Sequence, residues 1–264
     1  MSRTTKWQGS PLDASDLDLS GDNLRRQWDR MHRGNREPFP ADERLQEAWR
    51  QYHLGNFALA ADLGVAVGGA GAVPAAFATT IYAQYVEQDP ERKQALFKEA
   101  MAICRDAEER GVSTPNLHYI HAVSMGRYSQ FISMIEALAQ GFGGRIKEQV
   151  EKCLALDPQH AEGHVTFGGW HAAITDQAGG LMARMLYGAT QDEALEHYEE
   201  AVRLVPDSVV CRLEYARGLE VMYGDSERAR IVAEFEKALA LSPADAMQRL
   251  DVVQGRSQLA SLRG

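Results

Sequence analysis

The chain contains 264 residues, of which 45% are hydrophobic, and its formal net charge is −9. A chain of this length and apolar content can bury the core of one large domain or of a continuous array of small repeats. The acidic balance, with no basic cluster against it, disfavours nucleic acids and anionic membrane surfaces as partners and better suits a basic peptide or protein segment.

The three cysteines, Cys104, Cys153 and Cys211, are odd in number and far apart, and each lies within a helical pattern. No CxxC spacing is present that would build a zinc ribbon or a redox motif. We therefore expect buried free thiols in a reducing compartment. The first residues lack the apolar core of a signal peptide, so the expected location is the cytoplasm.

Residues 1–40 are predicted to form an N-terminal arm that is partly helical. Within it, Leu24, Trp28 and Met31 are spaced as one face of a short helix. The Pro38-Phe39-Pro40 sequence ends the segment as a turn or linker. The arm either caps the first repeat or docks into a groove of this chain or of a neighbour. The cap is favoured, because the open end of a solenoid needs covering.

The stretch from Leu63 to Val86 carries no charge and is long enough to span a bilayer. However, it consists mostly of Ala, Gly and Thr, and Gly68, Gly69, Gly71 and Pro74 interrupt its middle. These interruptions favour two buried helices joined by a glycine-rich turn, and we expect no membrane span.

Helical periodicity dominates from Glu43 onward, and no convincing alternating strand pattern is present. Prolines recur at intervals of roughly 40 residues, which is typical of a helical repeat with insertions. These prolines are Pro74, Pro115, Pro158, Pro206 and Pro243.

Three segments that end at such prolines, CLALDP (153–158), AVRLVP (201–206) and ALALSP (238–243), resemble the second helix of a tetratricopeptide repeat. The resemblance covers residues 115–243 well. It implies small–aromatic–small packing positions in the second helices, and a large residue, Leu, a small residue and Tyr in the first ones. The second-helix positions are Ile146, Val150, Cys153, Ala194, Tyr198, Ala201, Ile231, Phe235 and Ala238. The first-helix positions are His164, Phe167, Gly168, His171, Arg212, Tyr215, Ala216 and Leu219.

The resemblance implies an all-α, right-handed α-solenoid of about five tetratricopeptide-like hairpins. The domains expected are the arm (1–40), the repeat domain (41–243) and a C-terminal capping helix (244–264). Gly255 is expected to end or kink that last helix.

Two repeats contain apolar, helix-forming insertions, SQFISMIEALAQ (129–140) and DQAGGLMARMLYG (176–188). Together with the GGWH and EEALEHYEEAVRLVPDS segments, they resemble the regulator-of-microtubule-dynamics family and its bacterial relatives. Eukaryotic members of that family are linked to microtubules and organelle contacts. The resemblance implies the architecture. The microtubule role is not carried over, because no basic tubulin-binding segment is present.

Histidines are the most tempting candidates for a metal site. His164 and His171 are separated by roughly 10 Å along a helix axis, too far to ligate one zinc ion together. Only His160 with His164 could share a metal, with a third ligand such as His197. His164 and His171 also occupy packing positions, so we expect no metal and no cofactor, and the same reasoning applies to the His118–His121 pair.

Motifs of catalytic sites are absent: the sequence has no GxSxG, no phosphate-cradling GxxxxGK[ST] and no cysteine with a supporting histidine. The chain is therefore expected not to be an enzyme. The predicted function is a non-catalytic scaffold or adaptor that binds a protein or peptide in its concave groove. The predicted groove residues are Asn116, Tyr119, Arg127, Glu162, Arg217 and Glu220.

Two alternatives remain open beside the groove. A small-molecule or metal-binding role would depend on the histidines. A self-associating structural role would depend on Trp28 and on the second insertion, because exposed Met and Leu at helical spacing can form an adaptable contact surface. The predicted residues of that insertion surface are Leu181, Met182, Met185 and Tyr187.

Overall fold

The computed structural model describes residues 3, 7–12 and 14–264, so part of the predicted arm lies outside the described residues. Every regular element in the described part of the chain is helical, and successive helices pack against one another. The prediction of an all-α helical-repeat fold is therefore confirmed. The first half contains α1 (Asn23–Met31), α2 (Glu43–His53), α3 (Phe57–Val67), η2 (Gly69–Gly71), α4 (Ala72–Ile81), the π-helical turn η3 (Tyr82–Val86), α5 (Pro90–Glu109), α6 (Pro115–Ser129) and α7 (Met134–Ala139). The second half contains α8 (Phe142–Leu156), α9 (Ala161–Ala178), α10 (Gly180–Tyr187), α11 (Gln191–Leu204), α12 (Val209–Tyr223), η4 (Gly224–Glu227), α13 (Arg228–Leu239) and α14 (Ala246–Arg263).

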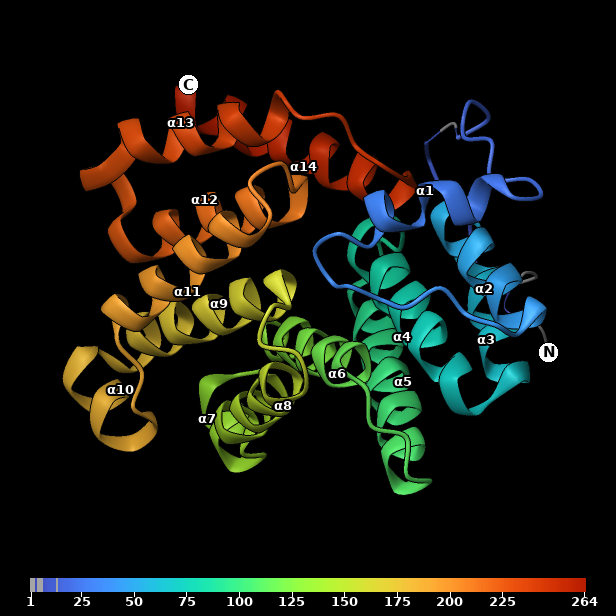
Figure 1. The fold of residues 1–264 in the computed structure, drawn as a ribbon. Coiled ribbons are helices and arrows are strands. Elements are labelled where there is room, and N and C mark those ends of the chain that lie inside the picture. The colour runs from blue at the N-terminus through green and yellow to red at the C-terminus, as the bar shows by residue number, and fades with distance from the viewer. Residues whose placement is uncertain (1–2, 4–6, 13) are drawn as a thin grey trace.

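Five helical hairpins follow one another around an arc (Figure 1). They are the pairs α2/α3, α4/α5, α6/α8, α9/α11 and α12/α13. Each of the two predicted insertions contributes one short helix, α7 in the third hairpin and α10 in the fourth.

Local sequence explains where many of the helices begin. Side-chain oxygens accept backbone N–H groups of the first turn, which satisfies donors that have no partner within the helix. Pro90 and Pro115 start α5 and α6, where a missing N–H costs nothing. Pro74 is the third residue of α4 and therefore also lies in a first helical turn. The capping residues are Asp42, Asp89, Thr114, Ser133, Thr190, Ser208 and Asp245.

The uncharged stretch forms two helices with a glycine turn between them, as the sequence predicts. Gly68 and Gly69 have φ values of +66° and +50°, a backbone conformation that side chains with a Cβ disfavour. In the described part of the chain, no helix combines the length and the apolar character needed to cross a bilayer.

All nine predicted second-helix packing positions are buried. A close approach of two helices occurs at Gly218 of α12, where an added Cβ would lie 2.3 Å from the ring of Tyr198. Only glycine lets α11 and α12 approach this closely. The three cysteines are also buried and free, which confirms the prediction of buried thiols.

The two ends of the arc meet, because α14 packs against α12 and α13 and also reaches α2 (Figure 1). The arm and α1 lie beside it: Arg30 donates to the carbonyl oxygen of Pro243, and Arg249 pairs with Asp16 at 2.7 Å. Leu24, Trp28 and Met31 are buried, which confirms the predicted helical face. The prediction for Gly255 was wrong. The helix α14 continues through it, and a Cβ there would lie 2.8 Å from Leu213 Cδ2, so this glycine serves close packing of α14 on α12.

A buried polar chain closes the contact between the two ends. His53 Nδ1 lies 2.7 Å from Asp245 Oδ2, and His53 Nε2 lies 3.0 Å from His32 Nε2. His32 Nδ1 in turn lies 2.8 Å from the side-chain oxygen of Asn35. These side chains are almost fully buried, so the hydrogen bonds replace the water that they lose on folding. The arm, the first hairpin and α14 are thereby joined.

Candidate functional site

The first half of the concave face is covered by the arm. Asn116 Nδ2 donates to the carbonyl oxygen of Asn35 at 2.9 Å and to Glu37 Oε2 at 2.7 Å. The backbone N–H of Glu162 donates to the carbonyl oxygen of Gly34 at 3.1 Å. An added Cβ at Gly34 would lie 2.6 Å from Glu162 Oε1, so a larger residue would push the arm away. Both interpretations of the arm therefore apply to part of it. Residues 34–37 dock against the predicted groove residues. Trp28 packs on Trp49 of the first hairpin, as a cap would.

Burial changes the protonation of the carboxyl groups under the arm. It raises the pKa of Glu162 to about 7, although hydrogen bonds from Tyr119 and Asn35 lower that pKa. Burial also raises the pKa of Glu37, which belongs to the arm itself, to about 7, although the hydrogen bond from Asn116 lowers that pKa. A charged carboxylate is costly in this setting, so both groups change protonation near neutral pH.

The second half of the concave face is covered by α14. Arg217 donates to Glu214 Oε1 at 2.7 Å and to Gln254 and Gln258 of α14 at 3.2 and 3.0 Å. Arg127 Nη2 donates to the same Glu214 oxygen at 3.2 Å. Both predicted groove arginines therefore have intramolecular partners.

Among the remaining predicted groove residues, Asn116, Tyr119 and Glu162 are buried, and Glu220 is partly exposed. The structure brings Asn116, Tyr119 and Glu162 together, and Arg127 and Arg217 together. The sequence analysis missed their partners in the arm and in α14. Those contacts join residues far apart in the chain, and no local pattern signals them.

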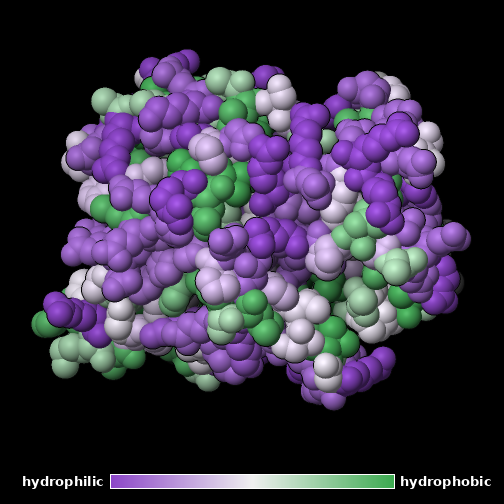
Figure 2. All heavy atoms as spheres, in the orientation of Figure 1, coloured by the Kyte–Doolittle hydropathy of each residue, from purple (hydrophilic) through white to green (hydrophobic). Residues whose placement is uncertain are grey.

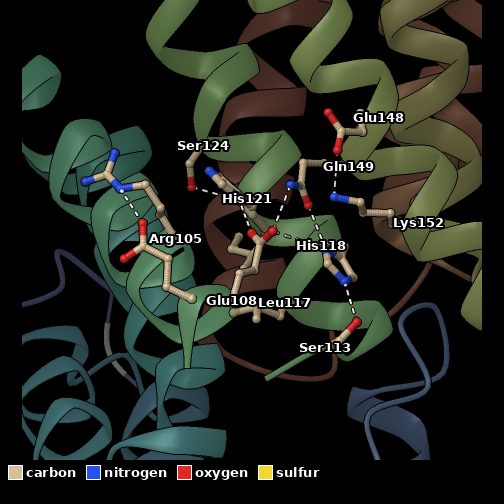
Figure 3. A network of polar contacts seen from close by, with 12 residues as sticks. Arg105, Glu108, Ser113, Leu117, His118, His121, Ser124, Glu148, Gln149 and Lys152 are labelled. Atoms are coloured by element: carbon tan, nitrogen blue, oxygen red, sulfur yellow. Dashed lines mark hydrogen bonds and ion pairs between the residues drawn. The ribbon is translucent and has the colours of Figure 1, made fainter. Parts of the chain in front are cut away.

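The predicted histidine pair His118 and His121 joins three helices in one polar network (Figure 3). His121 Nδ1 donates to Glu108 Oε1 at 2.6 Å, and His118 Nδ1 donates to Gln149 Oε1 at 2.6 Å. Gln149 Nε2 donates to the second Glu108 oxygen at 3.0 Å. Burial lowers the pKa of His121 in spite of the carboxylate beside it. The network ties α5, α6 and α8 together, a structural role that agrees with the packing interpretation of these histidines.

The structure gives His160 and His164 different hydrogen-bond partners. His160 accepts the N–H of Gly163 at 2.8 Å, which caps α9, and its other ring nitrogen lies 3.0 Å from Asn116 Oδ1. Because both ring nitrogens are engaged, His160 is no metal ligand in this arrangement. His164 instead contacts His197, with 2.9 Å between their Nδ1 atoms.

The two insertions expose apolar side chains. On α10, Leu181 and Met185 are 73% and 71% exposed, and Ile135 on α7 is 81% exposed. Figure 2 shows apolar surface at the lower left, over α10. We call the exposed residues of both helices the insertion surface. It consists of Met134, Ile135, Leu138, Leu181, Met182, Met185 and Leu186.

The end of α10 is anchored at the start of α8. Lys147 Nζ donates to the carbonyl oxygen of Tyr187 at 3.0 Å, and the Tyr187 ring lies against Gly143. Trp170 Nε1 donates to the carbonyl oxygen of Gly143 at 2.8 Å. Tyr187, which the sequence analysis placed in the contact surface, is partly buried and belongs to this anchor.

These features define an all-α helical-repeat protein whose concave face is filled from within and whose insertions are exposed. Residues 73–250 match the sequence model of the family described as "Regulator of microtubule dynamics protein 1-3". The match covers about two thirds of the chain, including both insertions. The chain therefore belongs to this family, and the resemblance noted from the sequence is confirmed. No individual curated protein matches the chain.

Proposed function

We propose that the protein is a non-catalytic interaction module that holds a partner protein on the insertion surface. The observation that carries the proposal is the exposure of seven large apolar side chains on α7 and α10. They make up more than half of the strongly exposed large apolar side chains in the described residues. Four of the seven are grouped on the single short helix α10, and grouped apolar side chains mark interaction sites more often than scattered single residues do.

The size of the surface favours a reversible complex. Complete burial of a Leu, Ile or Met side chain contributes about 1.5–3 kcal/mol, and these seven are already partly covered. Their burial against a partner would contribute on the order of 6–12 kcal/mol. Association itself costs about 4–15 kcal/mol, so we expect both helices to be needed and the complex to be transient.

The chemistry of the partner follows from the charge of the chain. With a net charge of −9, the protein attracts a basic segment at long range, and the apolar side chains then provide the close contact. Three buried free thiols suit a reducing compartment such as the cytoplasm. The concave groove is a less favourable site, since a ligand there must displace the arm or α14.

The proposal is tested with a photo-crosslinking residue at Leu186, which identifies the contacting protein in an extract of the native host. The affinity of the purified pair is then measured for the double variant Leu181→Ser/Met185→Ser. A matched control carries Val221→Ser/Val253→Ser, two side chains that are 47% and 48% exposed elsewhere on the surface.

We expect the α10 variant to bind at least tenfold more weakly and the control to bind like the wild type. Equal affinity of the two variants would contradict the proposal. Light scattering that shows a dimer lost in the α10 variant would assign the surface to a second copy of the chain. Co-sedimentation with phospholipid vesicles, lost in the same variant, would assign it to a membrane.

A further inference from the structure

We propose that His171, Glu193 and His197 form a binding site for a divalent transition-metal ion of the zinc type, between α9 and α11. Each residue offers one ligand atom, and these atoms all lie within 4.8 Å of one another. The site is separate from the insertion surface and does not depend on the proposed function.

Helix geometry brings the three residues together. Glu193 and His197 are four residues apart on α11 and therefore lie on one face of that helix. His171 comes from α9, which packs along α11. Ligands about 2.0–2.2 Å from a zinc ion lie roughly 3.4 Å from each other in a tetrahedral site. Ligand atoms at the observed limit of 4.8 Å would therefore have to approach each other by about 1.4 Å, and the exposed Glu193 has room for this side-chain movement.

The hydrogen bonds of His197 prepare it as a ligand. A carbonyl oxygen only accepts, so the contact of 3.0 Å between His164 Nε2 and the oxygen of Pro158 places the proton on that nitrogen. With the proton on Nε2, Nδ1 of His164 is the acceptor, and His197 donates from its own Nδ1 across 2.9 Å. The lone pair of His197 is left on Nε2. A metal-bound histidine usually donates its other N–H in this way, which fixes the orientation of the ring.

Metal coordination would replace only one weak hydrogen bond of the His171 ring. Its Nδ1 accepts the backbone N–H of Thr190 at 3.3 Å, which is long for such a hydrogen bond. Coordination through either ring nitrogen replaces this contact. Phe167 lies against both imidazoles, with ring centroids 4.7 Å from His171 and 4.6 Å from His197, and forms an apolar wall.

The local charges are compatible with a cation. Glu193 supplies a negative charge, and Glu200 lies near His197. Lys147 is the opposing cation, and it is engaged by the carbonyl oxygen of Tyr187 and the ring of Trp170.

Two imidazoles and one carboxylate are a ligand set that zinc shares with other first-row metals, and a fourth position stays open to water. Because α10 connects α9 to α11, a metal here would link the two helices at the base of this insertion.

The test uses the full chain after chelator treatment and dialysis. Titration with Zn²⁺ by calorimetry and with Co²⁺ by visible absorption gives the stoichiometry and the ligand field. The variants are Glu193→Gln, whose side chain is exposed and leaves the fold intact, and His197→Gln. The matched control is Glu196→Gln, which is exposed on the same helix outside the ligand set.

We expect one Zn²⁺ per chain, at least tenfold weaker binding for Glu193→Gln, no saturable binding for His197→Gln, and wild-type binding for Glu196→Gln. Absence of saturable Zn²⁺ binding by the wild type would overturn the proposal. Wild-type affinity of Glu193→Gln would also overturn it, because the metal would then bind elsewhere.

Discussion

Glu162 gives the sharpest test of how the arm is held, because its carboxyl group is buried under the arm and its pKa is raised to about 7. The ordinary value is 4.5. At pH 5 the folded protein therefore holds a proton on Glu162 that the unfolded chain has mostly released. This contribution to stability is fully present below the unfolded pKa and is lost as the pH rises through 7.

The magnitude follows from the two pKa values. Between pH 5 and pH 8, the contribution of Glu162 to the free energy of unfolding falls by about 2.5 kcal/mol. In Glu162→Gln the side chain is neutral at both pH values. The free energy of unfolding of this variant, relative to the wild type, should therefore rise by about 2.5 kcal/mol from pH 5 to pH 8.

Urea denaturation of both proteins at pH 5 and pH 8 measures this difference. Titrations that do not involve residue 162 contribute to both proteins, and we expect them to cancel in the difference. Glu196→Gln, at an exposed position, serves as the control and should show a change below about 0.5 kcal/mol. A difference between wild type and Glu162→Gln that is the same at both pH values would refute the reasoning about the buried carboxyl group.

Three further predictions concern packing, the arm and the insertion surface. Gly218→Ala should lower the free energy of unfolding by about 1–3 kcal/mol in urea denaturation, because the added Cβ meets the ring of Tyr198. Asn116→Ala removes the two hydrogen bonds that Asn116 donates to the arm, which should weaken docking of the arm by about 1–3 kcal/mol. Limited proteolysis should therefore cut residues 32–40 at least fivefold faster. Leu181→Ser/Met185→Ser should leave the free energy of unfolding within about 0.5 kcal/mol of the wild type, since both side chains are exposed.

Local patterns in the sequence predict the helices and much of the core. The spacing of Leu24, Trp28 and Met31 places α1, and the small–aromatic–small positions identify side chains that are buried in the structure. Gly68 and Gly69 end one helix and begin the next, as their backbone freedom suggests. These features depend on neighbours within one or two helical turns, and for that reason the sequence reveals them.

The filling of the concave face could not be predicted from the same patterns. Asn35 and Glu37 meet Asn116 across about 80 positions of the chain, and Arg217 meets Gln258 of a helix whose polar residues look solvent-exposed in sequence. Gly255 was misinterpreted for a related reason. From the sequence alone, a glycine that ends a helix cannot be distinguished from one that allows close packing, because the difference depends on the neighbouring helix.

The histidines illustrate both what local sequence patterns predict and what they do not. The rise of a helix separates His164 from His171 by too much for both to ligate one ion. The partners that the structure gives instead, Glu193 and His197, lie on the next helix of the hairpin, on the far side of the α10 insertion. Their approach depends on how α9 and α11 pack, which periodicity alone does not specify.

The central claim is that partners bind the insertion surface while the concave face stays filled. Amide hydrogen exchange of the chain with and without its crosslinked partner tests this claim most directly. We expect slower exchange in residues 134–139 and 180–187, with residues 32–37 and 246–263 unchanged. Slower exchange in residues 115–129 and 209–223, together with faster exchange in residues 32–37, would contradict it, because the partner would then have replaced the arm in the groove.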